Sequence, residues 1–130
     1  MKFSVGRDQL LKSLSYCQGV IEKRSTLPIL TNVLIEAKNS SIKITATDLD
    51  LIFTNLTNNI KIDTEGSTTI SASIIYDIVR KLSPGSEIKF HLVNENFSIE
   101  NGLLTPTMKV KRNKVIIKYK SILENFYNKQ

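Results

Sequence analysis

The sequence predicts an α+β fold with duplicated β-α-β-β-β units, a mostly antiparallel sheet with two helices on one face, and a C-terminal helix. Two segments about 65 residues apart carry apolar residues at helical spacing. Runs that alternate apolar and polar residues precede and follow both segments. Each predicted helix has a single apolar stripe, so both helices must be buried against the sheet.

The first unit begins with an alternating run at residues 2–5, followed by a predicted helix over about 7–21. The stripe of this helix consists of Leu10, Leu11, Leu14, Cys17, Val20 and Ile21. Its polar side consists of Arg7, Asp8, Lys12, Ser13 and Ser15. After Pro28, the runs 32–37 and 42–47 predict a hairpin, and residues 51–62 predict a further strand.

The second unit repeats this order, with a strand at 68–71 and a helix from about Ser73. The stripe of the second helix consists of Ile74, Ile75, Ile78, Val79 and Leu82, and the stop signal is Ser83, Pro84 and Gly85. Strands are predicted at 87–93 and 97–100. This unit is one strand short at Gly102, so the residues that follow must supply an edge strand or leave an edge exposed.

Charge separates the last part of the chain from the rest. Residues 1–101 carry 11 basic and 11 acidic residues, whereas residues 102–130 carry seven basic residues against Glu124 alone. We therefore predict a folded domain at 1–102 and a distinct tail at 103–130.

The tail has two predicted parts. In residues 104–110, alternate apolar positions fit an edge strand, where Pro106 is tolerated. Residues 113–130 predict an amphipathic helix with basic residues opposite its apolar stripe. Such a helix can bind DNA, a membrane surface or an acidic partner. It can equally pack on its own domain or pair with a copy of itself, which is our preferred interpretation.

Several classes of function find no support in the composition. One cysteine, Cys17, and one histidine, His91, leave no internal disulfide and no basis for a metal site, a cofactor site or a nucleophile–base pair. We expect Cys17 in the core and His91 on a strand face. The chain has no apolar run near 18 residues and no secretory signal, so we expect no membrane partner and, by default, a cytoplasmic location.

The predicted helices and their flanks carry most of the domain's excess positive charge. Segments 6–24 and 72–82 hold six basic and three acidic residues, a net charge of +3. The basic residues are Arg7, Lys12, Lys23, Arg24, Arg80 and Lys81. A cationic helix face suits a polyanion bound without sequence-specific contacts. The alternative is an ordinary solvated helix surface.

Three stretches carry a family resemblance: M-K-F-S-V-G-R-D-Q-L-L-K-S-L at the N-terminus, R-S-T-L-P-I-L-T-N-V-L-I-E-A at 24–37 and I-T-A-T-D-L-D at 44–50. With T-T-I-S-A at 68–72 and L-S-P-G-S-E-I at 82–88, they resemble the first domain of the bacterial sliding clamp, the DNA polymerase III beta subunit, over about 101 residues. The resemblance implies a non-catalytic protein whose helices line a ring around duplex DNA.

Arg24 matches a basic position that this family directs toward DNA, with Arg7, Lys12, Lys23, Arg80 and Lys81 as companions. Ser73 and Ile74 are neutral where the family often has basic residues. The chain ends after one domain, so we expect it to lack the family's main pocket for polymerase and loader peptides. It also departs from the family's own last strand, which forms the subunit contact, so we do not expect a normal ring.

After Gly102, the text L-T-P-T-M-K-V-K-R-N-K-V-I-I-K-Y-K-S-I-L at 104–123 resembles the C-terminal end of long-chain acyl-CoA synthetases, in which a lysine at the position of Lys109 is expected to touch the acyl-adenylate phosphate. Without a nucleotide-binding domain, this resemblance implies no ligase activity. Our first hypothesis is therefore a truncated, non-enzymatic sliding-clamp domain with an exchanged end that contacts duplex DNA. The alternative is a decayed or rearranged gene product that only self-associates through its tail helix.

Overall fold

The computed structural model describes residues 1–22 and 26–128. It divides into two compact units, Met1–Leu92 and Val93–Gln130, which are described separately below. The domain boundary that the charge pattern predicts, after residue 102, stays a prediction. The described fold combines antiparallel sheets with helices, as the sequence predicts.

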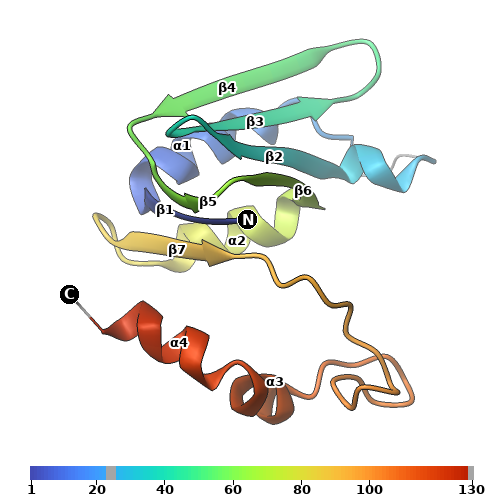
Figure 1. Cartoon of the computed structure of the whole chain (residues 1–130). Coiled ribbons are helices and arrows are strands. Elements are labelled where there is room, and N and C mark those ends of the chain that lie inside the picture. The colour runs from blue at the N-terminus through green and yellow to red at the C-terminus, as the bar shows by residue number, and fades with distance from the viewer. Residues whose placement is uncertain (23–25, 129–130) are drawn as a thin grey trace. The chain divides into compact units, whose positions relative to one another are not determined.

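The first unit contains all the strands that the structure describes, together with the first two α-helices (Figure 1). The first repeat comprises β1 (Lys2–Gly6), α1 (Arg7–Cys17), the 3-10 helix η1 (Pro28–Thr31), β2 (Asn32–Lys38), β3 (Ser41–Thr47), β4 (Ile52–Asn58) and β5 (Lys61–Thr64). The second repeat comprises β6 (Gly66–Ser71), α2 (Ala72–Lys81) and β7 (Glu87–His91).

The strands form two antiparallel sheets in place of a single one, in the orders β5-β1-β7 and β4-β3-β2-β6. Each repeat contributes its first strand to the sheet of the other repeat. Strand β6 pairs with β2, with Val33 opposite Ile70, and β7 pairs with β1, with Phe3 opposite Phe90. The two repeats are therefore interlocked and share one core.

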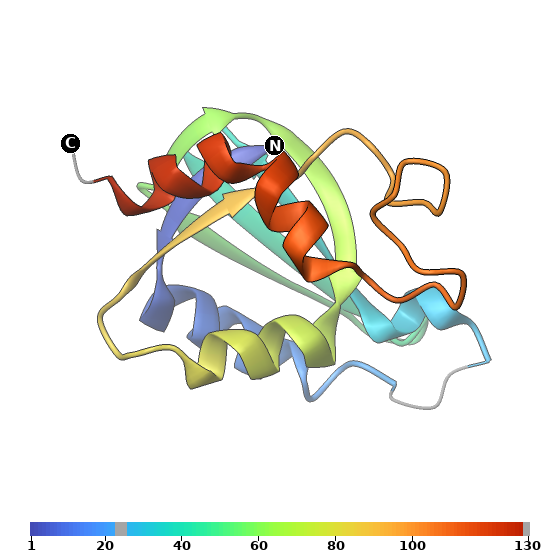
Figure 2. The ribbon, with the colours of Figure 1, turned by 90° about the horizontal axis from the view of Figure 1, so that it is seen from below.

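Helices α1 and α2 lie side by side on the same side of the sheets, which confirms the predicted arrangement (Figures 1 and 2). They run antiparallel. The first residue of α1, Arg7, contacts the carbonyl oxygen of Val79 near the end of α2, and Gln18 contacts that of Ala72 at its start. Both helices thus present one common outer surface.

The core of the first unit lies between the helix pair and the sheets. Leu14 and Cys17 of α1 are fully buried, as are Ala72 of α2 and Val33 of β2. The predicted position of Cys17 in the core is therefore confirmed. Burial of these side chains, at roughly 25 cal/mol per Å² of apolar surface, is the main force that fixes the helices on the sheets.

Two predicted elements of this unit are shorter than expected. Helix α1 ends at Cys17 instead of residue 21, and a tighter turn follows it, in which the amides of Gly19 and Val20 donate to the carbonyl oxygens of Tyr16 and Cys17, three residues back. The predicted strand over 51–62 is divided into β4 and β5 at Asn59, whose φ of 60° is in the left-handed region. This break lets one continuous segment contribute to both sheets.

The second unit contains neither of its predicted strands within the described residues. The segment predicted as a strand at 97–100 is a turn closed by two hydrogen bonds: Ser98 N donates to Asn101 Oδ1, and Asn101 N donates to Ser98 Oγ. Local side-chain acceptors thus replace a ladder partner. The predicted edge strand at 104–110 is a loop that closes on itself through an isolated bridge between Leu104 and Val110.

The predicted tail helix is divided in two, α3 (Arg112–Lys118) and α4 (Lys120–Tyr127). Tyr119, with φ −103° and ψ 21°, interrupts the helical backbone between them. Its ring stacks on Phe97 with the ring centroids 6.2 Å apart, and Lys118 pairs with Glu95. These contacts attach the helical part of this unit to its own loop.

Candidate nucleic-acid interface

Most of the predicted DNA-binding residues belong to the helix pair α1 and α2, so their exposure and contacts on its outer surface show which of them are free to meet a ligand. Of the six predicted residues, the structure describes four: Arg7 and Lys12 on α1, and Arg80 and Lys81 at the end of α2. Lys23 and Arg24 lie outside the described residues. Because the helices are antiparallel, three of the four are gathered at one end of the helix pair.

Arg7 is engaged within the fold. Its Nε donates to the carbonyl oxygen of Val79 over 3.1 Å, and a terminal nitrogen donates to that of Arg80 over 2.8 Å. The last carbonyls of a helix have no partner within it, and a basic side chain stabilises them. With its side chain only 12% exposed, Arg7 caps α2 and is poorly placed to meet a ligand in solvent.

Asp8 completes this cap. One carboxylate oxygen accepts a hydrogen bond from Arg7 over 2.9 Å, and the other accepts one from the amide of Gly85 over 3.0 Å. The hydrogen bond from Arg7, followed by that from Gly85, lowers the pKa of the Asp8 carboxyl. Asp8 therefore also neutralises Arg7, which further reduces the contribution of Arg7 to the surface potential.

Arg80 and Lys81 lie in the last turn of α2, and both are exposed. Arg80 is paired with Asp77 over 3.2 Å and lies 5.7 Å from the centre of the Tyr76 ring. Cations in this position also complement the negative end of the helix dipole. An exposed pair of this kind contributes little to stability, so both residues remain available to an anionic partner.

Lys12 is the predicted residue whose surroundings fit a ligand contact best. It is exposed near the middle of α1, one turn beyond Asp8. No ion pair of Lys12 is present within residues 1–22 and 26–128. Its charge is therefore not balanced by a neighbouring carboxylate of the described chain.

The outer surface is not uniformly basic. The two helices proper carry one net positive charge each, because Asp8 offsets one cation of α1 and Asp77 offsets one of α2. Exposed apolar side chains on α2 also interrupt the basic character of this surface, with Ile74 58% and Ile78 56% exposed. Contact with a polyanion is thus expected around Lys12 and the end of α2.

Ser13 lies on the buried side of α1, although the sequence pattern predicts it on the polar side. It is 3% exposed, and its hydroxyl donates to Asn55 Oδ1 of β4 over 2.7 Å. Thr57 Oγ1 lies 3.4 Å away. A polar contact therefore fixes α1 against β4. In the sequence, this contact could have been recognised from Asn55 and Thr57, which occupy alternate positions of the segment predicted as a strand.

Cys17 and His91 show no arrangement of a reactive site. Burial raises the pKa of the Cys17 thiol to about 11, which keeps it protonated and unreactive at neutral pH. His91 lies on β7, and burial, together with the positive charges of Lys2 and the N-terminus, lowers its pKa. In the part of the chain that the structure describes, no three metal-ligating side chains form a group.

None of the described helices is both long and apolar enough to cross a membrane. The basic residues of the second unit are partly paired: Lys118 with Glu95, and Lys120 with Glu124 over 3.6 Å. Lys109 lies in the loop that ends at the Leu104–Val110 bridge and is exposed. No phosphate-binding geometry surrounds it among the described contacts, and its suggested ligase role remains a prediction from the sequence.

Two interlocked strand–helix repeats, with paired helices on one side of antiparallel sheets, define a domain of the DNA-clamp class. The family model described as DNA polymerase III beta subunit, N-terminal domain, matches residues 1–117. The chain belongs to this family. The match extends past residue 102 and includes the first residues of the predicted tail.

Individual relatives agree with this assignment. The beta sliding clamp of Caulobacter vibrioides is 40% identical over 88 residues, which is 68% of this chain and 23% of the relative. That of Escherichia coli K12 is 35% identical over 102 residues, which is 78% of this chain and 28% of the relative. The chain thus spans about a quarter of the length of these relatives.

Solved structures show the same similarity. A sliding clamp from Caulobacter crescentus superposes with a TM-score of 0.69 at 36% identity, covering 74% of this chain and 26% of that one. One from Bartonella birtlesii superposes with a TM-score of 0.68 at 47% identity, covering 71% and 26%. Sliding clamps are non-catalytic processivity factors of DNA replication, so the family agrees with the expectation that the chain is not an enzyme.

Proposed function

We propose that this chain is a sliding-clamp N-terminal module that contacts duplex DNA weakly and without sequence preference through the outer surface of α1 and α2. The single observation that supports this most is the antiparallel helix pair, in which Lys12 on α1 and Arg80 and Lys81 on α2 are exposed on adjacent helices. Duplex DNA as partner and a cytoplasmic location are parts of the same proposal.

The structure narrows the set of residues in this proposal. Lys12, Arg80 and Lys81 are the exposed cations of the helix pair, and Arg24 is added on the basis of the sequence resemblance alone. Arg7 is removed from the set because it caps α2. Few phosphate contacts are expected, and each contact contributes about −0.9 to the slope of log K against log salt concentration.

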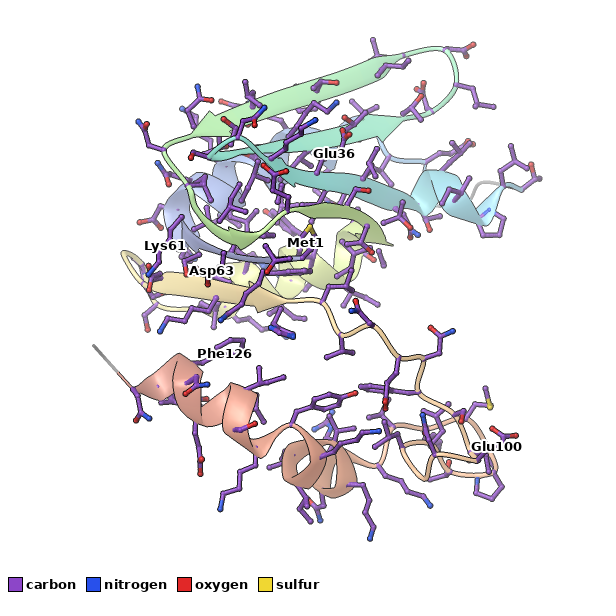
Figure 3. The ribbon with its side chains drawn as sticks, in the orientation of Figure 1. Met1, Glu36, Lys61, Asp63, Glu100 and Phe126 are labelled. Carbon is purple, nitrogen blue, oxygen red and sulfur yellow. The ribbon has the colours of Figure 1, made fainter. Side chains whose placement is uncertain are left out.

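Titration of a fluorescent duplex at several salt concentrations tests the proposal. We expect weak binding with a slope of about −2 to −3, and Lys12→Ala should make the slope less steep by about one. The matched control is Lys43→Ala, since Lys43 pairs with Glu36 on β3 and β2, away from the helices (Figure 3). Binding that Lys12→Ala together with Arg24→Ala leaves unchanged would contradict the proposal.

A second candidate function is self-association of the tail without a role in replication. Its support is the exposed apolar surface of the second unit, where Ile117 is 69% and Tyr127 85% exposed. Sedimentation of the full chain with Ile117→Asp tests it, with Asn113→Asp as the control for charge. The candidate requires an associated wild type that Ile117→Asp alone converts to a monomer.

A further inference from the structure

Residues 108–117 of the second unit, the basic segment, carry positive charge that no neighbouring carboxylate balances. Residues 101–123 contain no acidic residue. The exposed cations of the basic segment are Lys109, Lys111, Arg112 and Lys114. Among the residues that the structure describes, none of these four takes part in an ion pair, whereas Lys118 and Lys120, the next two cations, each pair with a glutamate. An anionic partner can therefore meet the four cations without breaking an internal ion pair.

The basic segment also exposes apolar side chains. On α3, Ile116 is 53% and Ile117 69% exposed. In the loop directly before α3, Met108 is 66% and Val110 50% exposed. Apolar side chains that are exposed together in one short segment, instead of singly, mark a surface that contacts another molecule.

The helical positions on α3 place its isoleucines between cations. Arg112 lies four residues before Ile116, and Lys114 lies three residues before Ile117, so each isoleucine has a cation as its neighbour on the helix surface. Val115, on the other side of the helix, is partly buried. Around the helix axis the exposed side chains follow one another in the order Arg112, Ile116, Asn113, Ile117 and Lys114. The exposed side of α3 thus has isoleucines at its centre and a cation at each margin.

An anionic lipid surface fits this arrangement better than the other possible occupants. Long basic side chains extend to charged head groups while apolar side chains beside them enter the boundary with the acyl chains. A second copy of the chain would bring the same cations against one another. A nucleic acid would leave the isoleucines in water, and the ring of Tyr119, on which a base could stack, is already stacked on Phe97.

We propose that the basic segment docks on the surface of a membrane rich in anionic lipids, with Ile116 and Ile117 inserted at the level of the head groups. A segment bound in this way lies in the plane of the interface and spans nothing. The contact therefore requires neither the long apolar run nor the export signal whose absence led to the expectation of no membrane partner. Docking is reversible and sensitive to salt, because the inserted surface is small and charge supplies part of the attraction.

Tryptophan fluorescence tests the insertion directly, because the chain contains no tryptophan. Full-length Ile117→Trp is mixed with vesicles of equal parts phosphatidylglycerol and phosphatidylcholine, or with vesicles of phosphatidylcholine alone. We expect a blue shift and protection from acrylamide quenching with the anionic vesicles only, and salt should reduce both. The matched control is Leu49→Trp: Leu49 is 68% exposed but lies between Asp48 and Asp50, so its emission should not change.

Co-sedimentation with the anionic vesicles separates the contributions of charge and apolar surface. Lys114→Gln should weaken binding about fivefold. Ile116→Ser together with Ile117→Ser should weaken it by roughly tenfold or more. Lys120→Gln is the control for net charge and should have a smaller effect than Lys114→Gln, since Lys120 is paired with Glu124. These side chains are exposed, so each variant should retain the wild-type circular dichroism spectrum.

An unshifted Ile117→Trp with anionic vesicles, an equal shift with neutral vesicles, or an equal shift in Leu49→Trp would each overturn the proposal. Without vesicle binding, affinity for a short oligonucleotide that Lys114→Gln lowers would assign the segment to a nucleic acid instead. Without vesicle binding, a dimer that Ile116→Ser together with Ile117→Ser dissociates would assign it to a second copy. Lys12→Ala should leave vesicle binding unchanged, so the membrane contact and the DNA contact of α1 and α2 are tested separately.

Discussion

Replacement of Arg7 by alanine separates the two roles that this residue can have. The sequence suggests a DNA contact, whereas the structure shows a cap on α2 with hydrogen bonds of 3.1 and 2.8 Å to the carbonyl oxygens of Val79 and Arg80. A hydrogen bond that involves a charged group contributes about 1.5–3 kcal/mol. Water can replace the bond to Arg80 in part, so we expect Arg7→Ala to lower the free energy of unfolding by about 2–3 kcal/mol.

Urea denaturation monitored by circular dichroism measures this change. Lys12→Ala is the control and should alter the free energy of unfolding by no more than about 0.5 kcal/mol, since Lys12 is exposed and forms no described ion pair. Arg7→Lys keeps the charge but loses the planar two-nitrogen contact, so it should recover only part of the stability. The reasoning is refuted if Arg7→Ala is as stable as Lys12→Ala.

Three further predictions concern the interior and the sheet edge. Ser13→Ala removes the 2.7 Å hydrogen bond to Asn55 Oδ1, which leaves only the longer one from Thr57 at 3.5 Å, and should lower the free energy of unfolding by about 1–2 kcal/mol in urea denaturation; an unchanged midpoint would contradict it. The Cys17 thiol, buried and with its pKa raised to about 11, should react with a disulfide reagent only at the rate of unfolding, and rapid reaction of the native protein would disprove this. Burial and the charge of Lys2 lower the pKa of His91 in the folded chain, so its contribution to stability is complete above the unfolded pKa of about 6.5 and is lost as pH falls toward the folded pKa. Unfolding free energies between pH 7.5 and 5.5 should therefore fall less in His91→Gln than in wild type, and identical curves would exclude this effect.

The helix pair was predictable because its information is local. Apolar residues such as Leu14 and Val79 recur at helical spacing, and each helix carries enough of them to require burial on a sheet. The exchange of first strands between repeats was not predictable in this way. It depends on pairings between residues far apart in the chain, such as Val33 with Ile70 and Phe3 with Phe90.

The side of β4 that faces the core was also hidden from the sequence. Ile52 and Leu56 lie on the exposed face, whereas Asn55 faces the helix, because the buried Ser13 hydroxyl supplies its hydrogen-bond partner. Hydrophobic alternation fails wherever a polar pair is satisfied inside the fold. Arg7 illustrates the same limit in the candidate site: its charge is visible in the sequence, but its use as a helix cap depends on contacts with residues more than 70 positions away.

The most direct test of the proposed DNA contact is an amide chemical-shift titration of the full chain with a short duplex at low salt. The account predicts that the largest shifts occur around Lys12 and in the last turn of α2, and that they diminish as salt is added. Shifts confined to residues 112–127, or shifts that are insensitive to salt, would contradict it.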